Sequence, residues 1–111
     1  MKKTIQAGLV GMGTVGSGVL HLLQEHREII RQRTGVDINL KTICDLRAED
    51  IRKGLAGITV TREWKEITDD PDIDIVIELI GGIEPARSII LEALSRGKSV
   101  VTANKKLLAE E

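Results

Sequence analysis

A glycine-rich segment at residues 11–16, Gly-Met-Gly-Thr-Val-Gly, lies between a short apolar run and a long stretch of helical periodicity. The order strand, glycine turn, helix is typical of the start of a dinucleotide-binding unit. Because glycine has no Cβ, Gly11 is expected to permit a tight turn, Gly13 to let the backbone approach a pyrophosphate, and Gly16 to let the helix lie close on the strand. The free amides at the helix start would face the anion. The motif alone is a weak signal, so its place between strand and helix carries the prediction.

The composition limits the classes of protein that fit this sequence. A chain of 111 residues is long enough for one domain whose core needs no disulfide or metal. The 16 Lys and Arg residues nearly balance the 17 Asp and Glu residues, so no overall field favours nucleic acid or an anionic membrane. Cys44 is the only cysteine, which predicts a reducing, cytoplasmic location, and no signal peptide or spanning segment is expected. Trp64 is the only aromatic residue, so the core should be aliphatic.

Short apolar runs alternate with longer helical periods, and no linker or repeat divides them. The pattern predicts one α/β domain over residues 1–111, a Rossmann-type parallel sheet with helices on both faces. Strands are expected at 5–10, 38–44, 58–60, 73–80 and 98–102, the fourth of them buried on both faces. Helical segments are expected at about 14–33, 45–54, 63–67 and 85–97, and from Lys105 onwards. The apolar stripe of the first helix should comprise Val15, Val19, Leu22, Leu23, Ile29 and Ile30.

A parallel sheet of this kind binds ligands over the carboxyl ends of its strands. Four segments distant in the sequence should meet at that rim, namely Gly11 to Gly16, Asp45, Ile80 to Gly82, and Thr102 to Lys105. Their convergence is the strongest argument from the sequence that the glycine loop is functional.

Three motifs occur in order along the chain: residues 11–19 (GMGTVGSGV), 72–82 (DIDIVIELIGG) and 100–105 (VVTANK). Together they resemble the amino-terminal, cofactor-binding domain of homoserine dehydrogenase over nearly the whole chain. The resemblance implies reversible hydride transfer between NAD(P)H and aspartate semialdehyde, giving homoserine on the path to threonine, isoleucine and methionine. It also implies that Met12 to Val15 touch the pyrophosphate, that Ile80 to Gly82 flank the adenosine half, and that Lys105 takes part in proton transfer beside the nicotinamide and substrate.

The same resemblance implies parts that this sequence lacks. Family members continue into a second domain that binds the amino-acid substrate, supplies a further catalytic lysine and acidic residues, and forms the dimer. The chain is therefore expected to be an excised domain competent for cofactor binding, and inactive by itself. The full-length enzyme is expected to be a homodimer.

The choice between NAD and NADP depends on the end of the second strand. An acidic residue there normally accepts the ribose 2′-hydroxyl of NAD, and Asp45, 29 positions after Gly16, is the candidate. Many relatives carry an arginine just before this aspartate, where this chain has Cys44. Arg47 is a possible substitute as a partner for a 2′-phosphate. The residues favour acceptance of NAD and leave NADP open.

Some residues have alternative interpretations. Lys105 is either a ligand contact or a surface lysine, although cations are not favoured at a helix start. Glu78 is either a structural carboxylate that accepts loop amides or a cofactor-site residue, and the structural role is favoured. Cys44 has no base nearby in sequence to activate it as a nucleophile. His21 and His26 are expected to be solvated, and the aspartates at 69–74 to form a solvated turn rather than a calcium site.

Other functions also fit the glycine loop. One is a non-catalytic NAD(H)-sensing module, which would not need the motif at Thr102 to Lys105. Another is the cofactor domain of a different amino-acid or aldehyde dehydrogenase. A kinase or GTPase is not expected, because no G-x-x-x-x-G-K-[ST] loop is present. No metal site is expected, and the predicted catalytic residue is Lys105. The predicted cofactor-binding residues are Gly11, Met12, Gly13, Thr14, Val15, Gly16, Asp45, Arg47, Ile80, Gly81, Gly82, Thr102, Ala103, Asn104 and Lys105.

Overall fold

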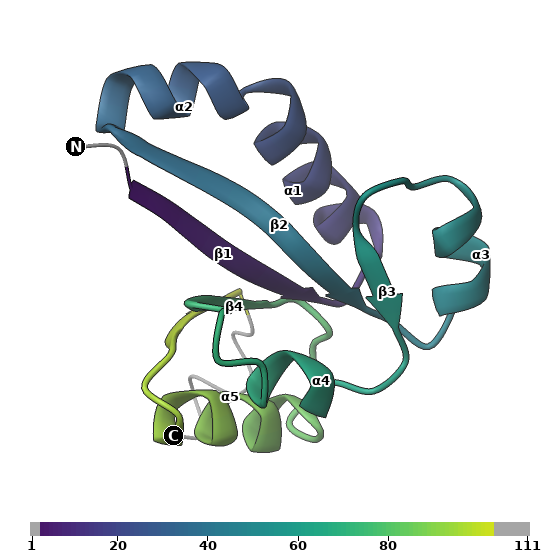
Figure 1. Cartoon of the computed structure of the whole chain (residues 1–111). Helices are drawn as coiled ribbons and strands as arrows, with labels where there is room; N and C mark the ends of the chain where they lie inside the picture. Colours follow the sequence, from purple (N-terminus) through teal and green to yellow (C-terminus); the bar gives the residue numbers. More distant parts are fainter. Residues whose placement is uncertain (1–2, 104–111) are drawn as a thin grey trace.

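The computed structural model describes residues 3–103, which form one parallel β-sheet with helices on both faces (Figure 1). The α/β, Rossmann-type fold predicted from the sequence is confirmed. The strands are β1 (Lys3–Val10), β2 (Val36–Cys44), β3 (Thr59–Thr61), β4 (Ile75–Glu78) and β5 (Ser99–Thr102). The helices are α1 (Thr14–Glu25), α2 (Arg27–Thr34), α3 (Ala48–Lys53), α4 (Lys65–Thr68) and α5 (Ala86–Ser95).

The strands lie in the order β3-β2-β1-β4-β5, with every pair parallel. The chain first moves outwards from β1 to β3 and then crosses back to β4 and β5. Helices α1 and α2 lie on one side of the sheet and α4 and α5 on the other (Figure 1). The order reverses between β1 and β4, and ligands of open α/β sheets bind outside the carboxyl ends of the strands at such a switch point.

Two aliphatic clusters form the core, one on each face of the sheet. On the α1 face, Leu9, Leu20, Leu40 and Ile43 are buried together, with Met12, Ile77 and Leu79 packed against them. On the α5 face, Val10, Ile67, Ile73, Val76 and Ile89 are buried, and the half-buried Trp64 packs at their margin. The predicted aliphatic core is therefore present, and Trp64, the one aromatic residue of the sequence, packs against it.

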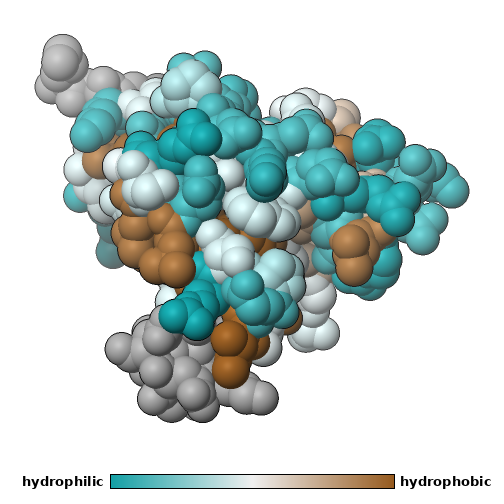
Figure 2. Space-filling view, turned by 90° about the horizontal axis from the view of Figure 1, so that it is seen from below, coloured by the Kyte–Doolittle hydropathy of each residue, from teal (hydrophilic) through white to brown (hydrophobic). Residues whose placement is uncertain are grey.

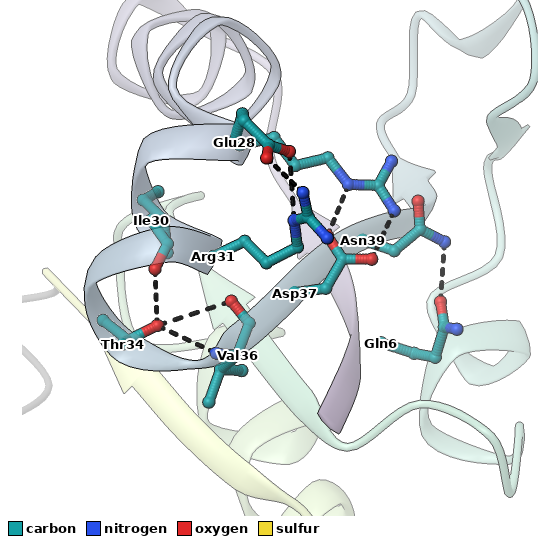
Figure 3. A network of polar contacts seen from close by, with 9 residues as sticks. Gln6, Glu28, Ile30, Arg31, Thr34, Val36, Asp37 and Asn39 are labelled. Atoms are coloured by element: carbon teal, nitrogen blue, oxygen red, sulfur yellow. Dashed lines mark hydrogen bonds and ion pairs between the residues drawn. The ribbon is translucent and has the colours of Figure 1, made fainter. Parts of the chain in front are cut away.

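The single helix predicted over residues 14–33 is wrong, because the chain bends at His26 into α1 and α2 (Figure 1). His26 has φ −108° and ψ 15°, yet its amide still donates to the carbonyl of Leu22 at 3.0 Å. Arg27, the next residue, donates from Nε and Nη2 to the two carboxylate oxygens of Asp37 on β2, at 2.6 and 2.8 Å (Figure 3). This ion pair ties α2 to β2, and a periodic sequence pattern does not reveal such a change of axis.

The apolar stripe of α1 also differs from the prediction. Gly16 and Leu20 are the buried residues of this helix, whereas Val15 and Leu22 are 62% and 54% exposed. Ile29 of α2 is 50% exposed. The apolar residues of the first helix thus form two groups, one on the sheet and one on the flank of the helix.

Strand β4 is shorter than predicted and is not buried on both faces. It ends at Glu78, so Ile80 lies in the following loop and is 38% exposed. Val76 and Glu78 are fully buried, while Ile75 and Ile77 are half-buried. A central parallel strand with one half-covered face is unusual, because such strands are normally covered on both sides.

Over residues 3–103, no helix is long and apolar enough to cross a membrane. In the same range, no three His, Cys, Asp or Glu side chains are grouped so that they could hold a metal ion.

Candidate cofactor-binding site

The loop between β1 and α1 is held by Gly11. This residue has φ +101°, and its amide donates to the carbonyl of Cys44 at 2.9 Å. A Cβ at this position would lie 2.8 Å from Cγ2 of Ile80 and 3.0 Å from the backbone carbon of Leu79. Both the backbone conformation and the space therefore require glycine. The predicted tight turn is present, and it brings the end of β1 against the ends of β2 and β4.

Gly16 and Gly13 differ in what surrounds them. A Cβ on Gly16 would lie 2.1 Å from the carbonyl oxygen of Gly11, whereas a Cβ on Gly13 would meet no atom within 4 Å. Gly16 therefore lets the first turn of α1 close against the loop at Gly11, whereas the prediction was a close approach to the strand, whose nearest atom, Cδ2 of Leu9, would lie 4.0 Å from that Cβ. Gly13 faces open space at the helix start, where no side chain caps the helix and its first turn has no acidic residue. The free amides of that turn, together with the helix dipole, suit a pyrophosphate. The residues present thus fit the dinucleotide that the fold implies.

Asp45 joins the glycine loop to the end of β2. Its Oδ2 accepts a hydrogen bond from the Met12 amide at 2.7 Å, and its Oδ1 accepts one from the Arg47 amide at 2.8 Å. The amide of Asp45 itself donates to the carbonyl of Thr61 at the end of β3, at 3.0 Å. The Met12 amide thus points to Asp45. The positioning role of Thr61 was missed, since no local pattern marks it.

The Asp45 carboxylate is held in its ionised form. Burial alone would raise its pKa, but the hydrogen bonds from the Arg47 and Met12 amides and the guanidinium of Arg47 outweigh burial, and the pKa lies below the ordinary value of an aspartate. The side chain is only 12% exposed. A carboxylate has about four acceptor positions. The three hydrogen bonds at Asp45 therefore leave room for one further donor.

Arg47 lies across this corner with its side chain 62% exposed. Its Nε donates to Oδ1 of Asp45 at 3.2 Å, and its Nη2 donates to the carbonyl of Met12 at 3.1 Å. The guanidinium therefore sits between Asp45, predicted to accept the ribose 2′-hydroxyl, and the glycine loop, predicted to touch the pyrophosphate. An exposed ion pair of this kind is worth little, so the guanidinium is able to change partners.

Glu78 organises the loop after β4. Its side chain is fully buried, and Oε2 accepts hydrogen bonds from the amides of Ile80 at 2.9 Å and Gly81 at 3.3 Å. Its Oε1 accepts the hydroxyl of Thr102 at 2.5 Å. The favoured structural role of Glu78 is therefore present. Gly81 and Gly82 have φ values of +77° and +75°, which glycine adopts at least cost.

The four predicted segments meet at one rim, as far as they are described. Gly11 contacts both the end of β2 and the Ile80 loop, and Thr102 reaches that loop through Glu78. Ala103 is exposed at the end of β5. Asn104 and Lys105 lie outside the described residues.

Cys44 is a free cysteine that is buried in the core cluster on the α5 face. Burial raises the pKa of the thiol to about 11, and the carboxylate of Asp45 adds to this shift. The thiolate that nucleophilic chemistry needs is therefore scarce near neutral pH.

The family described as homoserine dehydrogenase, NAD binding domain, matches residues 11–111. The chain belongs to this family. The homoserine dehydrogenase of Bacillus subtilis (strain 168) is 41% identical over 108 residues, which are 96% of this chain and 25% of that enzyme. The enzyme of Neisseria gonorrhoeae is 40% identical over 97% of this chain.

Solved homoserine dehydrogenase structures agree with this assignment. The structure from Thiobacillus denitrificans has a TM-score of 0.90 and 41% identity, and it covers 98% of this chain and 26% of its own. The structure from S. aureus at pH 7.5 has a TM-score of 0.82 and 36% identity, and it covers 96% of this chain and 27% of its own. The chain therefore spans about a quarter of its homoserine dehydrogenase relatives. It is an NAD-binding domain of this family, and the alternative of a sensing module is not favoured.

Proposed function

We propose that residues 1–111 form the cofactor-binding domain of an NAD(P)-dependent homoserine dehydrogenase, which interconverts aspartate semialdehyde and homoserine in the biosynthesis of threonine, isoleucine and methionine. The observation that carries the proposal is the family match over a loop whose glycines have the required geometry. The remaining three-quarters of such an enzyme would bind the amino-acid substrate and form the homodimer, in the cytoplasm.

Different described residues bind different parts of the cofactor. The first turn of α1, with Gly13, Thr14 and Val15, binds the pyrophosphate through backbone amides. Asp45 accepts a ribose hydroxyl at its remaining acceptor position, and the loop at Ile80 to Gly82 flanks the adenosine half. Thr102 and Ala103, at the end of β5, border the nicotinamide end.

Asp45 and Arg47 together support acceptance of NAD and leave NADP open. With NAD, Arg47 keeps its contacts with Asp45 and the Met12 carbonyl. With NADP, the exposed guanidinium turns towards the 2′-phosphate, for which its planar donors are suited. In this proposal Arg47 supplies the positive charge for the 2′-phosphate, because this chain has Cys44 where many relatives carry an arginine.

When bound, the nicotinamide supplies or accepts the hydride. The chain's contribution to the chemistry is Lys105, which we assign as the proton donor or acceptor at the substrate oxygen. Asn104 and Lys105 complete the cofactor site from the segment after β5.

A cofactor titration of the 111-residue chain tests the binding site. Gly13→Val puts a side chain into the open space at the helix start, and we expect calorimetry to show NADH binding at least about tenfold weaker, a loss of about 1.4 kcal/mol. Gly18→Val is the matched control, because a Cβ at Gly18 also meets no atom within 4 Å and the residue lies further along the same helix. Equal NADH binding by folded Gly13→Val and wild type would contradict the site.

The role of Lys105 requires an enzyme with its substrate-binding part. A chimera in which residues 1–111 replace the matched quarter of the Thiobacillus denitrificans enzyme provides one. There we expect Lys105→Ala to lower kcat by about 10²- to 10⁴-fold, the usual contribution of general acid-base catalysis, without weakening NADH binding. Lys106→Ala is the neighbouring control and should keep its kcat. The isolated 111-residue chain should show no turnover, because the substrate is not oriented.

A further inference from the structure

One face of the sheet is incompletely covered at β4 and β5. Ile75 and Ile77 of β4 are paired in register with Ser99 and Val101 of β5, and all four side chains lie on the α1 side of the sheet. We call these four residues the β4–β5 face. Ser99 is exposed and Val101 is 55% exposed. Among residues 3–103, the helix that packs on β4 and β5 is α5, which lies on the opposite side.

The neighbouring helix turns apolar side chains towards this face. At 3.6 residues per turn, Val15, Val19 and Leu22 lie roughly 60–120° around α1 from the buried Gly16, and Gln24 lies roughly 80° in the other direction. Gln24 lines a cavity of about 270 Å³ together with Ile38 and Leu40 of β2 and Ile58 beside β3. Since the strand order is β3-β2-β1-β4-β5, the flank formed by Val15, Val19 and Leu22 lies on the side of β4.

The two surfaces together make an apolar site for a helix. Parallel sheets are stable with both faces covered, and the elements that cover them are helices. The floor, Ile75, Ile77 and Val101, carries no charge, and the α1 flank adds the exposed Val15 and Leu22. The opposite surface, seen from below in Figure 2, also shows hydrophobic patches, which hydrophilic residues separate from one another.

We propose that the β4–β5 face and the α1 flank bind an amphipathic helix from the remaining three-quarters of the homoserine dehydrogenase polypeptide. Relatives are about four times as long as this chain, since it spans 25% of the Bacillus subtilis enzyme. The helix lies beside α1 and covers the second face of β4, so that the strand at the topological switch point is buried on both sides. The proposal rests on the proposed function, because that function supplies the occupant.

Thiol labelling tests the proposal. Val101→Cys places a thiol on the face, and Ser95→Cys places one at the exposed end of α5 on the other side of the sheet. Cys44 is buried, with a pKa of about 11, and does not compete for a maleimide. The rates are measured by peptide mass spectrometry in the 111-residue chain and in the Thiobacillus denitrificans chimera. If the chimera does not fold, the remainder of that enzyme is added as a separate polypeptide and the same rates are measured.

We expect both thiols to react rapidly in the 111-residue chain. In the chimera, position 101 should react at least about tenfold more slowly, which corresponds to an opening free energy of about 1.4 kcal/mol, and position 95 should react as before. An unchanged rate at position 101 would overturn the proposal. Slow reaction at position 101 in the 111-residue chain would also overturn the proposal. If that rate fell with increasing protein concentration, a second copy of the chain would cover the face. If the rate did not depend on concentration, the chain's own residues would cover it.

NADH titration of the chimera separates this inference from the proposed function. If the thiol at position 101 were protected from labelling but NADH did not bind, the cofactor function would be contradicted and the helix site would stand. If NADH bound but the thiol at position 101 were not protected, the helix site would be contradicted and the cofactor function would stand.

Discussion

At the scale of single residues, the glycine loop shows that identical residues serve different purposes. Gly11 adopts a backbone conformation that other residues avoid, Gly16 permits a close approach, and Gly13 leaves an opening. The motif predicted the tight turn at Gly11 and a close approach at Gly16, although to the strand rather than to the loop, and the pyrophosphate contact of Gly13 stays a prediction. It did not predict that the Met12 amide donates to Asp45. That contact joins residues 33 positions apart and depends on how β2 ends beside the loop.

The close approach at Gly16 leads to a testable prediction about stability. In an exposed helix interior, Gly→Ala stabilises a protein by about 1 kcal/mol. At Gly16 the new Cβ would lie 2.1 Å from the Gly11 carbonyl oxygen, which is backbone and has to shift. We therefore expect Gly16→Ala to lower the free energy of unfolding, by about 1–3 kcal/mol as for an overpacked core, in urea denaturation. Gly18→Ala, where a Cβ meets nothing within 4 Å, should raise it. If both substitutions stabilised the chain, the close contact at Gly16 would be disproved.

At the scale of elements, periodicity predicted where most strands and helices occur and failed where tertiary contacts decide. The first helix was predicted as one unit because its apolar residues recur every three or four positions. The structure bends it at His26, where Arg27 pairs with the buried Asp37 of β2. Likewise β4 stops at Glu78, because that carboxylate binds the amides of Ile80 and Gly81 and folds the chain back. Neither a change of axis nor a side chain that caps its own loop alters the spacing of apolar residues.

The ion pair between α2 and β2 gives the prediction at this scale. Arg27→Ala removes two hydrogen bonds from Asp37, whose side chain is 10% exposed. Because the Arg27 side chain is 47% exposed, solvent reduces the loss, and we expect the free energy of unfolding to fall by about 1–2 kcal/mol. Arg31→Ala is the matched control: Arg31 pairs with the exposed Glu28 on the same helix, and because exposed ion pairs contribute little to stability, the loss should be clearly smaller than for Arg27→Ala. Urea denaturation that showed equal losses would mean that α2 is not anchored by Arg27.

At the scale of the whole molecule, the fold was predictable because strand and helix patterns alternate and parallel crossovers allow few topologies. The convergence of the site segments followed from the same topology. The sequence did not reveal how far each face of the sheet is covered. The apolar residues Ile75 and Ile77 are typical of a strand that is buried on both faces. Only the structure shows that their face of β4 is half-buried. The proposed helix on the β4–β5 face would complete the covering that the apolar sequence of β4 predicts.

The last prediction concerns the stability of the whole domain in the presence of cofactor. A ligand that binds the folded state alone stabilises it by RT ln(1 + [L]/Kd), which is about 2.7 kcal/mol when the ligand is a hundredfold above its Kd. For a domain of this size, about 1 kcal/mol raises Tm by roughly 4–8 °C, so NADH at that excess should raise the Tm of the wild-type chain by roughly 10–20 °C. Gly13 is part of the cradle yet packs against nothing, so Gly13→Val should keep the Tm of the unliganded chain and lose most of this rise. Differential scanning calorimetry of both proteins measures the two effects. A wild-type Tm that did not respond to NADH would contradict cofactor binding by the folded domain, and a full response in Gly13→Val would place the cofactor elsewhere.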